Sequence, residues 1–349
     1  MDRLLNNETH SYIIPGMSYL RLRTARTAAL RLLLVPAVAG ATVLGAAGCG
    51  SSGAASHRSA RSSSAPPAIQ GEAVKGKIKV VAAENFWGSI AAQLGGNEVK
   101  ERAIITNPKV DPHSYEPSPS DAQLLDSADL VIINGIGYDE WAKRLLAGGE
   151  RPPDQIVLEV GELLGLHPGD NPHQWYSPTS VEKVIAAITA DYIRLKPNYR
   201  SYFEAKRREF ETVDLAAYHR LLAEIRSRFA GVPVGYSESI FQPMGEYLGL
   251  KLVTPYEFAK DVAEGVEVPP QLQAEVEAQA REHKIDVWIY NSQNATPGIK
   301  RINRIASAAG EPIVTITETL DPANDTFEQW QVLELEHLKE ALAEAVRRG

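Results

Sequence analysis

The side chains best suited to chemistry in this chain occur in a short phrase that the sequence spells twice. The first copy, DPHSYEPSP, covers residues 111–119, and the second, NPHQWYSP, covers residues 171–178. Each copy places Asp or Asn before Pro-His, an aromatic residue two positions after the histidine, and a Ser-Pro pair behind it. Neutral imidazole is a common ligand for transition metals. The repeated phrase therefore predicts a metal site shared by His113 and His173.

The sequence around each histidine would hold it in one place. Pro112 and Pro172 restrict the backbone just before the two histidines, which lowers the entropy that a flexible ligand loses on binding. Apolar runs at residues 99–105 and 155–158 precede the two copies and are predicted strands. Each copy is therefore expected in a loop beyond the carboxyl end of a strand, where open α/β sheets bind their ligands.

A helix start is expected directly behind each histidine loop. Ser118 and Ser177 each precede a proline, the order expected for an N-cap followed by proline at the first helical position. For the second loop, Thr179 with Glu182 could instead form a capping box. Either choice would fix the loop at the beginning of a helix.

Short apolar runs alternate with helical patterns along most of the chain, which predicts parallel sheets covered by helices. The expected strands lie at residues 77–83, 99–105, 129–134, 155–158, 232–237, 251–254, 286–291 and 312–317. The pattern restarts after residue 231, so we predict two α/β lobes, at 77–196 and 232–349.

Residues 197–231, between the two runs, have no internal glycine or proline, and apolar residues such as Phe203, Phe210 and Val213 recur at helical spacing. A coiled-coil pair would give this pattern. We favour one long rigid helix that joins the two lobes, because an α/β run lies on each side of it.

The beginning of the chain reads as a targeting segment. Four arginines precede an apolar run, LLLVPAVAGATVLGAAGC, which ends at Cys49. A basic stretch, an apolar core and small residues are typical of a secretory signal peptide, predicted here over residues 1–49. Its end resembles a bacterial lipobox, in which the cysteine is lipidated, although Ala46 stands where leucine is usual. A transmembrane anchor and an ordinary signal cleavage are the alternatives, and translation could start at Met1 or at Met17.

Composition restricts which structural and functional classes of protein the chain can belong to. Residues 50–76 are rich in Ser, Ala, Gly and Pro and are predicted to form a disordered tether. A lipid on Cys49 would hold the folded lobes at the extracytoplasmic face of the cell membrane. The net charge of −8 gives no basic footprint for nucleic acid, and the single cysteine excludes an internal disulfide.

Over about residues 77–347 the chain resembles the zinc- and manganese-type solute-binding lipoproteins of ABC transporters. The resemblance rests on six runs in this order: DPHSYEP 111–117, ADLVIINGIGYDEW 128–141, NPHQW 171–175, SESIF 237–241, YNSQNATP 290–297 and TETLDP 317–322. It implies two α/β lobes joined by one long helix, with one metal bound in the cleft and passed to a membrane permease. We expect the protein to act as a monomer.

The resemblance also implies a set of metal ligands. His113 and His173 match the ligands of the first lobe, and Glu238 matches the third ligand, which is His or Glu in the family. The fourth is a carboxylate after the last strand, for which Glu318 fits best. Asp321 is its rival, because some members carry Asp-Pro at that position.

This ligand set favours a carrier over an enzyme. Four protein ligands leave little room for a substrate or an activated water, whereas catalytic zinc usually keeps an open position. The carboxylates lean toward manganese, which accepts bidentate oxygen ligands and higher coordination numbers, but zinc has the higher intrinsic affinity, so the metal stays open between them. A metal-dependent surface adhesin, a zinc metallohydrolase and a siderophore or haem carrier remain as alternative functions.

Overall fold

The computed structural model describes residues 74–348 except residue 111. The predicted signal peptide, with Cys49, lies outside the described residues, as does all of the predicted tether except its last three residues. Val74 and Gly76 of these three are hydrogen-bonded to the first lobe. Within the described residues, no helix is long and apolar enough to cross a membrane.

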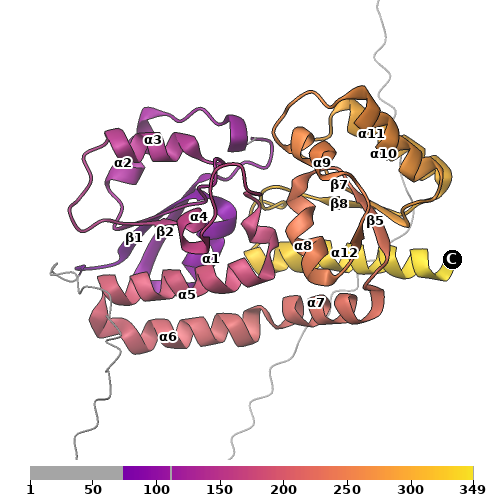
Figure 1. The fold of residues 1–349 in the computed structure, drawn as a ribbon. Helices are drawn as coiled ribbons and strands as arrows, with labels where there is room; N and C mark the ends of the chain where they lie inside the picture. Colours follow the sequence, from indigo (N-terminus) through magenta and orange to yellow (C-terminus); the bar gives the residue numbers. More distant parts are fainter. Residues whose placement is uncertain (1–73, 111, 349) are drawn as a thin grey trace, which may run out of the picture. The chain divides into compact units, whose positions relative to one another are not determined.

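The first lobe, as far as the chain is described, contains a parallel sheet in the strand order β2-β1-β3-β4. Two of these strands, β1 and β2, are labelled in Figure 1. Its strands are β1 (Ile78–Glu84), β2 (Val99–Ile105), β3 (Leu130–Ile133) and β4 (Ile156–Glu159). Its helices are α1 (Asn85–Gly95), α2 (Pro119–Asp126), α3 (Glu140–Gly148), α4 (Val160–Leu164) and α5 (Pro178–Leu195). Separate apolar clusters cover the two faces of the sheet, which explains why its strands read as nearly continuous apolar runs.

The second lobe repeats this plan with a parallel sheet in the order β6-β5-β7-β8. Its strands are β5 (Pro233–Tyr236), β6 (Lys251–Leu252), β7 (Val287–Asn291) and β8 (Ile313–Ile316). Its helices are α8 (Gln242–Leu248), α9 (Tyr256–Ala263), α10 (Pro270–Arg281), α11 (Pro297–Ala309) and α12 (Phe327–Arg348). Because all its strands are parallel, the carboxyl ends of β5, β7 and β8 lie side by side at one edge of the sheet.

The linking segment differs from the uninterrupted helix predicted over residues 197–231. It consists of α6 (Arg200–Glu209), a π-helical turn (Phe210–Asp214) and α7 (Ala216–Phe229). In the π turn, the Leu215 N–H donates to the Phe210 carbonyl five residues earlier at 2.9 Å. Such a turn inserts one extra residue and rotates the rest of the helix. Val213, which recurs with Phe203 and Phe210 at helical spacing, is therefore 65% exposed, whereas Phe210 and Leu215 are buried.

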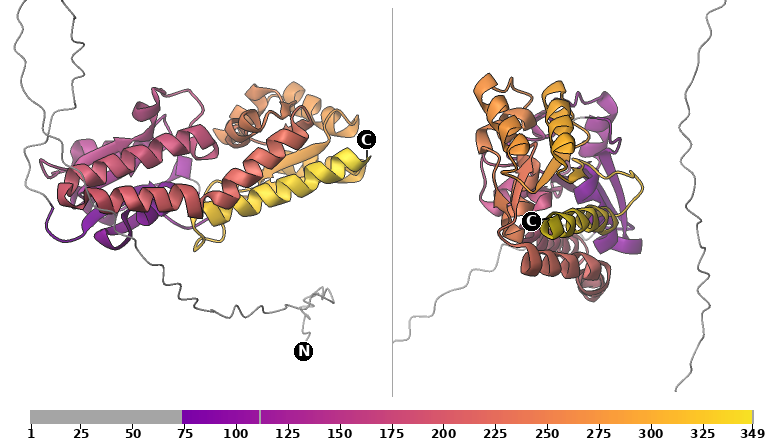
Figure 2. Two further views of the ribbon diagram at one scale, coloured as in Figure 1. Left: turned by 90° about the horizontal axis from the view of Figure 1, so that it is seen from below. Right: turned by 90° about the vertical axis from the view of Figure 1, so that its right-hand side faces the viewer.

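The linking segment joins the cores of the two lobes. Helix α6 packs on α5 and α1 in the first lobe, and α7 packs on α12 and α8 in the second (Figure 2). One apolar cluster runs from β1 through the linking segment to α12 and includes Trp175, Phe210 and Trp330. The lobes are therefore held together by shared apolar packing in addition to the polar contacts described below.

Candidate metal centre

The two histidine loops lie at the carboxyl edge of the first sheet, as predicted. His113 sits in a single 3-10 turn (Pro112–Ser114) between β2 and α2, and His173 directly precedes another (Gln174–Tyr176) between β4 and α5. The centroids of the two imidazole rings are 5.9 Å apart. The repeated phrase therefore does bring both histidines to one place.

Both predicted helix caps are confirmed. Ser118 caps α2 with proline at the first turn, and a capping box joins it to Asp121. Ser177 caps α5, where its side chain accepts the backbone N–H of Ser180 at 3.3 Å. The alternative cap at Thr179 is not the one that forms.

Asn171 fixes the tautomer of His173. The Asn171 amide nitrogen donates to the Ser239 carbonyl at 2.7 Å, so its Oδ1 faces His173 Nδ1 at 2.8 Å and must be the acceptor. Nδ1 of His173 therefore carries the proton, and Nε2 keeps a lone pair. Burial lowers the pKa of His173, so the neutral ring predominates at neutral pH. A second residue that orients a histidine in this way is typical of metal ligands.

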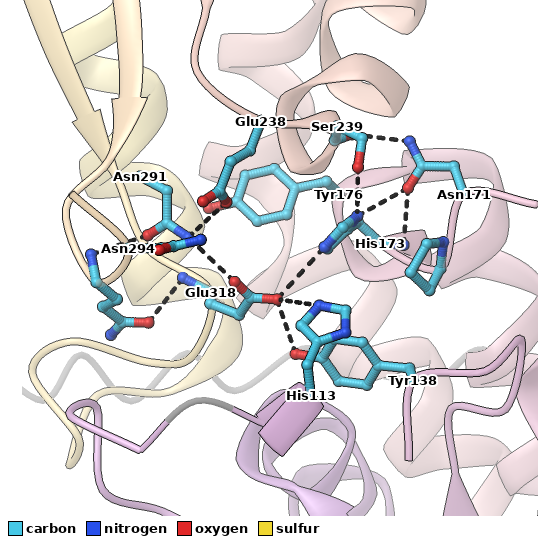
Figure 3. Close-up of polar contacts among 12 residues, drawn as sticks. His113, Tyr138, Asn171, His173, Tyr176, Glu238, Ser239, Asn291, Asn294 and Glu318 are labelled. Atoms are coloured by element: carbon cyan, nitrogen blue, oxygen red, sulfur yellow. Dashed lines mark hydrogen bonds and ion pairs between the residues drawn. The ribbon is translucent and has the colours of Figure 1, made fainter. Parts of the chain in front are cut away.

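Glu318 lies opposite both histidines (Figure 3). Its Oε1 is 3.3 Å from Nε2 of His173 and 3.5 Å from Nε2 of His113, and it accepts the Tyr138 hydroxyl at 3.0 Å. Burial alone would raise the pKa of Glu318, but attraction to the two histidines, which is strongest when either ring takes up a proton, outweighs it and holds the pKa well below its usual range. A neutral imidazole beside an ionised carboxylate is the protonation state that a divalent metal requires.

Potential ligand atoms of His113, His173 and Glu318 all lie within 4.8 Å of one another. The structure therefore brings together three of the four residues named as ligands from the sequence. Asp321, the rival for the fourth position, is exposed.

Glu238 joins this group through a shared hydrogen-bond partner. It follows β5, is 1% exposed, and its Oε2 accepts the Asn291 amide at 2.8 Å. The same amide donates to Oε2 of Glu318 at 3.0 Å. Glu238 does not belong to the set whose ligand atoms lie within 4.8 Å of one another, but it lies beside it on the second lobe.

Sequence reasoning missed three residues of the site: Tyr138, Asn171 and Asn291. All three lie within runs that carry the family resemblance, yet none received a role. The signal for Asn171 was its place two residues before a candidate ligand. The signal for Asn291 was its place at the end of a predicted strand.

Two cavities reach the site from different sides. One, of about 140 Å³, is lined by His113 and His173 together with Asp170 and Glu264. The other, of about 60 Å³, is lined by His113 and Glu318. His113 faces both, and its side chain is 23% exposed while that of His173 is 1% exposed. The site is therefore accessible to an ion mainly past His113.

Two α/β lobes, with two histidines of one lobe facing a buried carboxylate of the other, define a solute-binding protein for a metal ion. The chain belongs to the family described as zinc-uptake complex component A, periplasmic, whose model matches residues 80–341. The resemblance to metal-binding solute-binding proteins of ABC transporters is therefore confirmed. So is the interpretation that the chain is a transport protein and not an enzyme.

The names of curated relatives mention different metals. The manganese-binding lipoprotein MntA of Halalkalibacterium halodurans is 26% identical over 190 residues, which cover 52% of this chain and 61% of the relative. The iron-binding protein YfeA of Yersinia pestis is 25% identical over 242 residues, 66% of this chain and 75% of the relative. The chain thus spans between about half and three quarters of the length of the curated relatives it matches.

Solved structures share the fold. The manganese-bound periplasmic metal-binding protein of Candidatus Liberibacter asiaticus has a TM-score of 0.63 at 20% identity, and the match covers 76% of this chain and 100% of that protein. The SBP FpvC of P. aeruginosa in complex with Ni²⁺ has a TM-score of 0.62 at 19% identity, over 77% of this chain and 98% of that protein.

Proposed function

We propose that this chain captures one divalent transition-metal ion, zinc or manganese, and delivers it to the membrane permease of an ABC importer. The ligands are His113, His173, Glu238 and Glu318. The observation that carries the proposal is the convergence of both histidine Nε2 atoms on Oε1 of Glu318. Glu238 is tied to that carboxylate through one amide.

The charges and the placement of these residues suit a cargo site. Two carboxylates balance a divalent charge, and two imidazoles supply nitrogen donors. Two ligands come from each lobe, so a bound ion would hold the lobes together and the permease would have to release it by separating them. Relatives named for manganese and iron support a divalent transition metal without choosing among the ions.

The full chain, purified from its membranes without chelator, should carry one equivalent of metal. Elemental analysis measures this, and a chelator should remove the ion reversibly because binding is non-covalent. Deleting the gene should reduce cellular uptake of the same metal. Substrate turnover by the loaded protein would instead favour a metallohydrolase, and metal-independent binding to a macromolecule with unchanged uptake would favour an adhesin.

We further propose that Cys49 carries a lipid that anchors the protein on the extracytoplasmic face, where it works as a monomer. The relative MntA is named a lipoprotein, and Cys49 closes the apolar run at the start of the chain. Replacing Cys49 by alanine should move the protein from the membrane fraction to the soluble extracytoplasmic fraction, as seen by fractionation and immunoblotting. Equal membrane retention of the variant would contradict the anchor.

A further inference from the structure

Asn291, at the end of β7, uses both amide protons and its amide oxygen in hydrogen bonds. Its amide nitrogen donates to Oε2 of Glu238 at 2.8 Å and to Oε2 of Glu318 at 3.0 Å. Its Oδ1 accepts the backbone N–H of Gln293 at 2.9 Å. The side chain is fully buried. Asn291 is thus the residue that connects the two acidic candidate ligands (Figure 3).

The orientation of this amide is settled by its partners. A backbone N–H can only donate, so the atom that faces Gln293 must be the oxygen, and the NH₂ group must face the carboxylates. An NH₂ group has two protons, and each carboxylate receives one of them. The Asn291 backbone N–H is also held, by Ser237 Oγ at 3.0 Å, so the whole residue is fixed before any ion arrives.

The strand order explains why one residue can reach both acids. β7 lies between β5 and β8 in the parallel sheet. Glu238 follows β5 and Glu318 follows β8, so the residue that ends β7 lies between them at the carboxyl edge. Asn291 pairs in register with Ile316, two residues before Glu318.

We propose that Asn291 determines which metal the site prefers by restricting each carboxylate to one coordinating oxygen. This inference rests on the proposed function. The amide holds Oε2 of Glu238 and Oε2 of Glu318 toward Asn291, so we expect each carboxylate to turn Oε1, and not both oxygens, toward the ion. Oε1 of Glu318 already faces both histidines, and its hydrogen bond from Tyr138 leaves a second lone pair.

Restricting the carboxylates in this way changes which metal ion the site is expected to prefer. Two imidazoles and two single oxygens give four bonds, the number that zinc prefers in protein sites. Manganese favours higher coordination numbers, which carboxylates supply when they bind through both oxygens. The preference for manganese that the ligand types alone suggest requires both oxygens of each carboxylate. Asn291 holds one oxygen of each carboxylate away from the ion, so the site prefers zinc over manganese.

The first test uses the unmodified full chain loaded with Co²⁺, which absorbs visible light much more strongly in four-coordinate than in six-coordinate sites. We expect the strong, four-coordinate spectrum. The weak spectrum of a six-coordinate ion would overturn the inference. Failure of the chain to bind Co²⁺, Zn²⁺ and Mn²⁺ at all would instead contradict the proposed function, so the two failures are distinguishable.

The second test replaces Asn291 by alanine, with Asn291→Ser as a second variant that keeps a polar group if the first does not fold. Freed carboxylate oxygens should lower the ratio of zinc to manganese affinity by at least roughly 10-fold, the usual size of such indirect effects. The Co²⁺ spectrum should weaken in parallel. Competition titrations of Zn²⁺ against Mn²⁺ measure the ratio.

Ser292→Ala is the matched control. Ser292 is the next residue, and its hydroxyl donates to the Ile316 carbonyl at 3.4 Å and to neither carboxylate. The Ser292→Ala variant should keep the wild-type ratio of zinc to manganese affinity and the wild-type Co²⁺ spectrum. If folded Asn291→Ala or Asn291→Ser also keeps both, Asn291 is only a structural residue and the inference is wrong.

Discussion

Replacing His113 by alanine should weaken metal binding by at least roughly 100-fold, since loss of a direct ligand exceeds the 10–100-fold cost typical of indirect partners. His113 supplies one of four proposed bonds, and its Nε2 lies 3.5 Å from Oε1 of Glu318. Its side chain is 23% exposed, so the variant should fold. Competition with a chromophoric chelator, in the background of the full chain, measures the change in Kd.

His167→Ala is the matched control for this change. His167 is also a loop histidine of the first lobe, but it is exposed and is not part of the group of potential ligands. Its loss should leave Kd unchanged. Wild-type affinity in His113→Ala would contradict the proposed site.

A pair of acid variants decides the fourth ligand. Glu318→Ala should lose tight binding, because Glu318 is the carboxylate that faces both imidazoles. Asp321→Ala should bind like the wild type, because Asp321 is exposed. The opposite result would assign the fourth position to Asp321.

The sequence alone predicted the features that local patterns determine. Parallel strands buried on both faces leave continuous apolar runs, so β2 was found at its observed bounds, Val99–Ile105. Ser-Pro pairs act within one helical turn, so the caps at Ser118 and Ser177 were also found. His113 and His173 were predictable together because the chain repeats the local phrase that holds them.

Features that depend on the order of strands in space were not predictable in this way. The role of Asn291 follows from the position of β7 between β5 and β8, which apolar runs do not reveal. The π turn at Phe210–Asp214 is another case. Its extra residue buries Phe210 and Leu215 five positions apart, a spacing that a regular helix would not give.

We expect Glu334 in α12 to carry a proton at neutral pH, because burial raises its pKa and its hydrogen-bond geometry suits the protonated form. The Tyr176 hydroxyl lies 2.8 Å from the Thr317 carbonyl and 2.6 Å from Oε2 of Glu334. A hydroxyl has one proton, so an ionised Glu334 would have to share it with the Thr317 carbonyl, whereas a protonated Glu334 donates to Tyr176 and leaves Tyr176 to donate to Thr317. Burial raises the pKa of Glu334 to about 8, which agrees with this arrangement.

The protonated side chain links both halves of the metal centre. Tyr176 ends the 3-10 turn that follows His173, and Thr317 directly precedes Glu318. Oε1 of Glu334 accepts the backbone N–H of Thr317 at 2.9 Å and Nε1 of Trp330 at 2.9 Å. Loss of the proton would leave a buried charge and remove one hydrogen bond between the lobes.

Raising the pH should therefore destabilise the metal-free protein through Glu334. Its folded pKa of about 8 lies above the ordinary value of 4.5. The stabilisation is complete below pH 4.5 and is lost as pH rises through 8, because the unfolded chain releases the proton first. The free energy of unfolding should fall by up to about 5 kcal/mol across that window from this group. Burial also raises the pKa of Asp139 and of Glu101 to about 7, with the same sign.

Glu334→Gln isolates this contribution, because the amide can donate to Tyr176 and accept from Thr317 as the protonated acid does. In urea titrations, the variant should match the wild type at pH 5 and exceed its free energy of unfolding at pH 8 by a few kcal/mol. Glu334→Leu should lose about 2 kcal/mol at both pH values, since it leaves the buried Thr317 backbone N–H without an acceptor. Glu336→Gln, an exposed position on the same helix, should retain the wild-type dependence. A Glu334→Gln variant that retained it as well would show that Glu334 is ionised in the folded protein at neutral pH.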